Sequence, residues 1–202
     1  MRNKSKLVYG FGVNDVDSQV AIHAVVDGKR KQLFMCPYYS DWRDMIFRAT
    51  SEKFKNARPT YKDCTICDEW KYFSNFIKWV DSQPNKNWQK CALDKDLLCS
   101  GSKIYSPENC VYVDTVLNSF MTLRNNDRGK YMVGVSFDRE SGKYRAECSN
   151  PFNPNIKRFI GRYNTEIEAH KAWQAKKHEY ACMLADLQND TRVAEALRNK
   201  FS

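Results

Sequence analysis

The sequence predicts an α+β protein built from two modules, the second a three-stranded antiparallel sheet packed on one long helix. Two observations predict that second module. Apolar and polar residues alternate in three short runs after residue 130, which is the period of a half-buried strand. The run from 165 to 188 then changes to the helical period, with its apolar residues on one face.

The first module is expected to span residues 1–123. Residues 19–26 resemble a short strand, and residues 40–54 are predicted to form a helix that Ser40 caps. A second helix is predicted over 68–83, because its aromatic residues recur at helical spacing. Stripes of this kind more often pack in a core than bind a ligand. The two apolar faces consist of Trp42, Met45, Ile46 and Ala49, and of Trp70, Phe73, Phe76, Ile77 and Val80.

The stretch ALDKDLLCSGSKIYSPENCVYV, residues 92–113, combines two short apolar runs with many polar groups. It is predicted to form a strand, a Gly-Ser turn at 100–102, a returning segment, and a helix or turn towards Phe120. A buried hairpin does not require this number of polar groups. These polar groups therefore mark the stretch as a candidate functional site.

Residues 124–130 are polar, contain a glycine and are predicted to link the modules. The second module covers 131–188, with strands at 131–140, 143–150 and 157–164 and a helix at 165–188. Thr165 and Glu168 have the spacing of a capping box at the start of that helix. Residues 189–202 are expected to form a C-terminal tail.

Alternation along the strands divides their residues between two faces. A polar, mostly basic ribbon matches the width of a DNA major groove, where Arg and Lys can recognise guanine and Glu can accept from cytosine. A solvated sheet face is the alternative, and the net charge of +9 favours DNA. The helix side is expected to hold Val135, Phe137, Tyr144, Ala146, Cys148 and Ile160, and the outward, DNA-binding side Ser136, Asp138, Lys143, Arg145, Glu147, Lys157 and Phe159.

Composition limits the classes of protein that remain. The 202 residues are 42% hydrophobic and 13% aromatic, which argues against a disordered chain. No apolar run reaches the roughly 18 residues of a membrane span, and the basic N-terminus lacks the apolar core of a secretory signal. We expect a cytoplasmic protein whose eight cysteines are reduced. Cys64 and Cys67 form a lone CxxC pair, so buried free thiols are favoured over zinc.

Residues 131–173 resemble the APETALA/ethylene-response-factor DNA-binding domain. The family's Gly-Val strand, Lys-aromatic strand and apolar-Gly-x-aromatic strand correspond here to 134–135, 143–144 and 160–163, and its Thr-x-x-Glu-Ala helix start to 165–169. The resemblance implies that the outward sheet residues contact double-stranded DNA. Ser136 and Asp138 stand where the family usually carries arginines, so the base preference does not transfer.

Nearly the whole chain also resembles phage-type HNH endonucleases that join a catalytic module to this DNA-binding domain. The resemblance lies in SKLVYGFGVND, YKDCTICDEWKYFSNF and LDKDLL…YSPENC. It implies a ββα-metal module at about 90–120, in a homing or otherwise mobile nuclease of a bacterial or phage-infected cell. Asp94, Asn109 and Asn118 match the metal ligands, and an oxygen-only site suits Mg²⁺ or Mn²⁺. Lys95 occupies the place of the general-base histidine, where it can grip phosphate while metal-bound water attacks.

Two interpretations of function follow. The first is a sequence-specific, metal-dependent HNH DNA endonuclease with Asp94, Lys95, Asn109 and Asn118 as catalytic residues. The second is a catalytically silent, nuclease-derived repressor of a phage or mobile element, since loss of the base leaves DNA affinity intact. An RNA-binding module is less favoured, because the strands lack the aromatic signature of an RNA-recognition motif.

Overall fold

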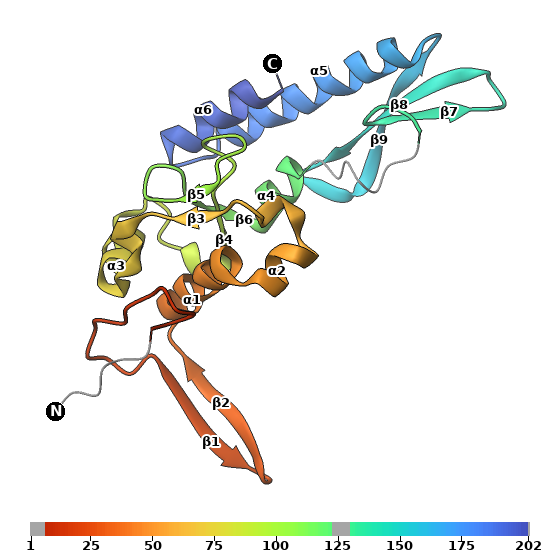
Figure 1. Ribbon diagram of the computed structural model, residues 1–202. Coiled ribbons are helices and arrows are strands. Elements are labelled where there is room, and N and C mark those ends of the chain that lie inside the picture. Colours follow the sequence, from red (N-terminus) through yellow and green to blue (C-terminus); the bar gives the residue numbers. More distant parts are fainter. Residues whose placement is uncertain (1–6, 123–129, 202) are drawn as a thin grey trace. The chain divides into compact units, whose positions relative to one another are not determined.

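The computed structural model describes residues 7–122 and 130–201. The chain divides into two compact units between Val113 and Asp114, each combining helices with small sheets (Figure 1). The α+β class is therefore confirmed, whereas an HNH module is not. The first module was expected to extend to residue 123, but residues 114–121 belong to the second unit. Residues 124–129 of the expected linker lie outside the described residues.

The first unit begins with an antiparallel hairpin and continues through three α-helices, three 3₁₀ helices and four short strands among its described residues. In chain order these are β1 (Ala21–Val26), β2 (Lys29–Met35), α1 (Pro37–Thr50), α2 (Glu52–Ala57), η1 (Pro59–Tyr61), β3 (Thr65–Ile66), η2 (Asp68–Lys71), α3 (Phe73–Ser82), η3 (Trp88–Lys90), β4 (Cys91–Asp94), β5 (Ile104–Tyr105) and β6 (Val111–Asp114).

The core of the first unit is built on the apolar faces of α1 and α3, as the sequence predicts. Trp42 is fully buried, and its indole nitrogen donates a hydrogen bond of 2.7 Å to the carbonyl of Trp70. The ring of Phe73 lies 5.1 Å from that of Trp42. Burial of aromatic side chains such as these stabilises the unit through the hydrophobic effect and ring packing.

The helix boundaries differ from the prediction because stronger local signals lie nearby. Helix α1 starts at Pro37, whose fixed φ suits a first helical position, so Ser40 lies inside the helix instead of capping it. Ser51 ends α1 and caps α2, since its hydroxyl accepts from the amide of Phe54. The predicted second helix is likewise divided, and η2 carries Trp70.

The predicted hairpin at 92–113 has a different pairing. Strand β4 pairs with β6, and the intervening β5 pairs in parallel with β3, far away in sequence. The return strand directly after the Gly-Ser turn is therefore not the partner of β4. The ladder of β3 with β5 joins Thr65 to Ile104 and Ile66 to Tyr105, which fixes Cys67 beside the core.

The second unit contains helix α4 (Thr115–Met121), strands β7 (Val135–Asp138), β8 (Lys143–Asn150) and β9 (Asn153–Tyr163), and helices α5 (Glu166–Ala185) and α6 (Thr191–Lys200). The three strands form one antiparallel sheet in the order β7-β8-β9, with α5 packed on one face (Figure 1). Both hydrogen bonds of the predicted capping box are present, between Thr165 and Glu168. The residues expected as a tail, 189–202, contain α6, which packs on α5.

Strand β7 approaches α5 so closely that only glycine fits at its start. Gly134 has φ of +73°, and a Cβ placed there would lie 2.0 Å from Cδ1 of Trp173. Trp173 is 7% exposed and stacks on His170, whose Nδ1 lies 3.0 Å from the carbonyl oxygen of Val133. The sheet is thus held tightly against the helix at this end.

A buried lysine ties α4 to the helix pair. The ammonium of Lys177 donates to the carbonyl of Phe120 at 2.7 Å and lies 3.5 Å from the centre of its ring. Phe201, at the end of α6, packs edge-on against Phe120. Burial lowers the pKa of Lys177 to about 8.

None of the helices in the described part of the chain has the length and hydropathy of a membrane span.

Candidate nucleic-acid interface

The outward face of the three-stranded sheet carries a row of polar side chains whose order follows from strand register. Ser136 on β7 pairs with Arg145 on β8, and Arg145 pairs with Arg162 on β9. Directly paired residues point to the same face. One hydroxyl and two guanidinium groups therefore lie side by side across the strands.

A bulge in β9 brings an aromatic ring onto the same face. Arg145 pairs with Arg162, but Glu147 pairs with Phe159, so Ile160 is an extra residue in the ladder. Because Arg145 and Glu147 share a face, Phe159 and Arg162 share it too, although they are three residues apart. The Phe159 ring lies 5.2 Å from the Arg145 guanidinium and 5.3 Å from that of Arg162.

Two ion pairs position the guanidinium groups. Arg145 contacts the Glu147 carboxylate at 2.5 Å, and Nε of Arg162 donates to the Asp138 carboxylate at 2.7 Å. The hydrogen bond from Arg162, with a further one from Ser141, lowers the pKa of Asp138 to about 2. Both arginines remain more than 40% exposed, so contacts of this kind contribute little to stability and can be exchanged for a ligand.

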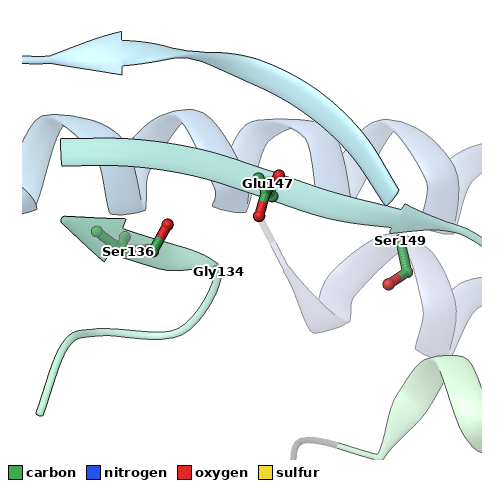
Figure 2. A pocket seen from close by; sticks show the side chains of 5 residues that line it. Gly134, Ser136, Glu147 and Ser149 are labelled. Atoms are coloured by element: carbon green, nitrogen blue, oxygen red, sulfur yellow. The ribbon is translucent and has the colours of Figure 1, made fainter. Parts of the chain in front are cut away.

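A shallow hollow lies beside these pairs, where β7 starts alongside β8 (Figure 2). It is lined by Gly134, Val135, Ser136, Glu147 and Ser149. The amide of Glu147 donates to the carbonyl of Gly134 at 2.9 Å, which fixes the carboxylate at the rim. Hydroxyl groups donate and accept, whereas a carboxylate only accepts, so the hollow suits a partner with hydrogen-bond donors.

The sequence-predicted outward residues have the following positions. Ser136, Lys143 and Phe159 are exposed, while Asp138, Arg145 and Glu147 are partly buried by their ion pairs. Lys157 lies on β9, and its side chain falls outside the described part of the chain. On the helix side, Ala146 and Cys148 are buried, whereas Phe137 is 38% exposed.

Arg162 was not among the expected residues. Strict alternation from Phe159 places position 162 on the helix side, and the bulge reverses this assignment. A glycine inside a strand often marks such an irregularity, so Gly161 is the signal that could have indicated it. Its pairing with Ala146, on the helix side, leaves Arg162 on the outward face.

The polar stretch at 92–102 forms a self-contained network. One carboxylate oxygen of Asp94 accepts from the amides of Asp96 and Leu97, at 2.9 and 2.7 Å. The Lys95 side chain is 7% exposed. Its ammonium donates to Asp96 at 2.7 Å and to the carbonyl of Ser102 at 2.9 Å. Lys95 thus holds the loop closed, and its charge is already paired.

The expected metal ligands are distributed over both units. Asp94 ends β4, and Asn109 precedes β6 with its amide nitrogen donating to the carbonyl of Ile104 at 3.3 Å. Asn118 lies on α4 in the second unit, so convergence of the three ligands stays a prediction. The second carboxylate oxygen of Asp94 accepts no hydrogen bond from any described residue, which leaves one ligand atom for a hard cation.

The two cysteines of the CxxC pair, Cys64 and Cys67, do not form a disulfide. Cys64 is buried and Cys67 half-buried, and burial raises the pKa of Cys67. Burial also raises the pKa of Cys110 to about 12. Within residues 7–122 and 130–201, no group of three His, Cys, Asp or Glu side chains is arranged to hold a metal ion.

Comparison with known proteins supports part of the sequence prediction. A stretch of 51 residues is 51% identical to part of the ethylene-responsive transcription factor ERF116 of Arabidopsis thaliana. The match covers 25% of this chain and 17% of that protein. The resemblance to an ethylene-response-factor domain is thus supported over a quarter of the chain. No family model and no solved structure matches this chain. The resemblance to HNH endonucleases therefore stays a prediction.

Proposed function

We propose that this protein binds double-stranded DNA in a sequence-specific manner through the outward face of β7, β8 and β9. The observation that carries the proposal is the row formed by Arg145, Arg162 and Glu147, held on a rigid sheet with a helix behind it. The partial match to a transcription factor adds independent support.

The chemistry of this row suits base edges in a major groove. Arginine forms two parallel hydrogen bonds with guanine, and a glutamate accepts from the cytosine amino group. Arg145 would exchange its bond to Glu147 for a base, and because its side chain is 41% exposed this exchange costs on the order of 1 kcal/mol. Phe159, whose ring lies near both guanidinium groups, offers apolar contact to a thymine methyl group.

The test is selection of a preferred duplex from a random library, followed by anisotropy titrations. Arg145→Ala and Arg162→Ala should each weaken binding to the selected duplex by about 1–3 kcal/mol and relax the preference at one base pair. Lys171→Ala is the matched control, because it removes one exposed charge from α5 on the other side of the sheet. Equal losses in all three variants would refute base recognition by this face. A structured RNA competitor separates DNA from RNA binding.

DNA cleavage by residues 90–120, with Mg²⁺ or Mn²⁺ as cofactor, is a separate proposal. Its support is the pairing of β4 with β6, directly followed by α4, which is the ββα order that the resemblance implies. Bound at Asp94, Asn109 and Asn118, the ion would polarise the phosphate. Lys95 stands where the resemblance places the general-base histidine, and it already donates to Asp96 and to the carbonyl of Ser102. This favours the alternative, a DNA-binding regulator that does not cut.

The selected duplex also distinguishes these two alternatives. Cleavage is measured in Mg²⁺, in Mn²⁺ and in EDTA, and binding is measured in parallel. For a nuclease, Asp94→Asn should abolish cutting and leave binding within about twofold, since it removes a ligand charge and not a phosphate contact. Asp63→Asn, which removes an exposed carboxylate elsewhere in the first unit, is the control. Tight binding without any metal-dependent cutting would reject the enzyme and leave the regulator.

A further inference from the structure

The β1–β2 hairpin of the first unit stands apart from the core. Its strands pair with each other from Ala21–Met35 to Val26–Lys29, and among the described residues they pack chiefly on each other (Figure 1). Asp27 and Gly28 have φ of +53° and +71°, as a tight two-residue hairpin turn requires. The ribbon is therefore well formed locally although little covers it.

Both faces of this hairpin are open to solvent. Val25 is 75% exposed on one face, Phe34 is 44% exposed on the other, and the unpaired bulge residue Leu33 is 62% exposed. A two-stranded hairpin without a covering layer is marginally stable in water. Exposed apolar side chains on a ribbon that little covers indicate a binding element.

The charge of the hairpin identifies its partner. Lys29 and Lys31 point to one face and Arg30 to the other, so the tip is positive all round. Asp27 is the one acidic residue among 21–35, and its contact with Lys31 at 3.7 Å is largely exposed and weak. Two copies of this tip would repel each other, whereas a polyanion neutralises them.

We propose that the β1–β2 hairpin is a second DNA-binding element, with Lys29, Arg30 and Lys31 contacting phosphates while the ribbon lies in a groove. A major groove about 12 Å wide accepts a two-stranded ribbon, and a six-residue strand reaches about 20 Å along it. The inference rests on the proposed DNA binding but concerns a surface in the other unit, so the two can fail separately.

The salt dependence of binding measures these contacts. Each phosphate contact contributes about 0.9 to the slope of log K against log salt, so three contacts contribute about 2.7. Between 50 and 200 mM salt, a fourfold change, wild type should lose roughly 40-fold more affinity than Lys29→Ala/Arg30→Ala/Lys31→Ala. The control Lys53→Ala/Arg58→Ala/Lys62→Ala removes three exposed charges elsewhere in the unit and should keep the wild-type slope.

A photocrosslinking residue in place of Val25 supplies a second measurement in the full chain. It should crosslink to the bound duplex, and the same residue in place of Lys53 should not. Wild-type slope in the hairpin variant, or absence of crosslinks on DNA that is bound, would overturn the proposal. Crosslinks to a second protein chain would do the same and assign the hairpin to dimerisation.

The parallel measurement on Arg145→Ala/Arg162→Ala separates this inference from the proposed function. Suppose that this variant retains sequence preference while the hairpin variant shows the expected decrease in the slope of log K against log salt. The hairpin proposal then stands, and recognition by the sheet fails. If neither variant changes binding, both fail. A chain that binds no duplex at all also refutes both.

Discussion

Gly134→Ala tests the close approach of β7 to α5. The new methyl group would lie 2.0 Å from Cδ1 of Trp173, and the residue would keep a φ of +73°. Both effects destabilise the second unit. Gly142→Ala is the matched control, because Gly142 also has a positive φ, +63°, but nothing lies within 4 Å of its missing Cβ.

The two substitutions divide the cost into two parts. A left-handed conformation costs a non-glycine residue about 1–2 kcal/mol, and both variants carry this cost. Only Gly134→Ala also overpacks the interface with a buried indole, which typically adds about 1–3 kcal/mol. We therefore expect Gly134→Ala to lose about 2–5 kcal/mol in the free energy of unfolding, and Gly142→Ala about 1–2 kcal/mol.

Native-state hydrogen exchange of α5 amides is the appropriate assay, since four of the five tryptophans belong to the first unit and dominate the fluorescence. Gly134→Ala combined with Trp173→Leu should recover part of the loss relative to the sum of the single variants. If Gly134→Ala costs no more than Gly142→Ala, or if the double variant shows no coupling, the close approach does not exist in solution.

Three further predictions follow from individual groups. Because burial lowers the pKa of Lys177 to about 8 from 10.5, the unfolded chain binds the extra proton between these values, so stability of the second unit should rise from pH 8 to 10.5; denaturant titrations should show a smaller rise in Lys177→Met. Asp138→Asn removes a negative charge and releases Arg162, so affinity for random duplex should increase severalfold by anisotropy at low salt; weaker binding would mean that the carboxylate orients Arg162 for DNA. Elemental analysis of purified protein should find no stoichiometric zinc, and one zinc per chain, lost in Cys64→Ser, would contradict this.

Elements that depend on local periodicity could be predicted from the sequence. The buried faces of α1 and α3 and the three strands with α5 follow from spacing alone, because side-chain direction is fixed by position within one regular element. The helix starts were less accurate. Helix α1 begins at Pro37, about one helical turn before Ser40. Both residues are possible helix starts, and the local sequence pattern does not decide between them.

Elements that depend on pairing could not be predicted in the same way. The parallel ladder between β3 and β5 joins residues about 40 positions apart, and two-residue strands leave no periodicity. Strand β2 was missed because KRKQ lacks alternation and no core covers it. At the candidate interface, six of the seven expected outward residues have described side chains. Arg162 could not be assigned to the outward face from the sequence, because its direction depends on the bulge at Ile160, which is visible only in the strand pairing.

The bond from Lys177 to the carbonyl of Phe120 has a consequence for transplanting the C-terminal unit into another protein. A fragment cut at residue 131 would discard α4 and with it the acceptor of a mostly buried ammonium. It would also uncover Phe201, which packs against Phe120 and Trp173. A buried charge without its partner is strongly destabilising. A graft that begins at Asp114 keeps the cap of α4, the carbonyl of Phe120 and the aromatic contact together. The longer fragment is therefore the one expected to fold in another protein.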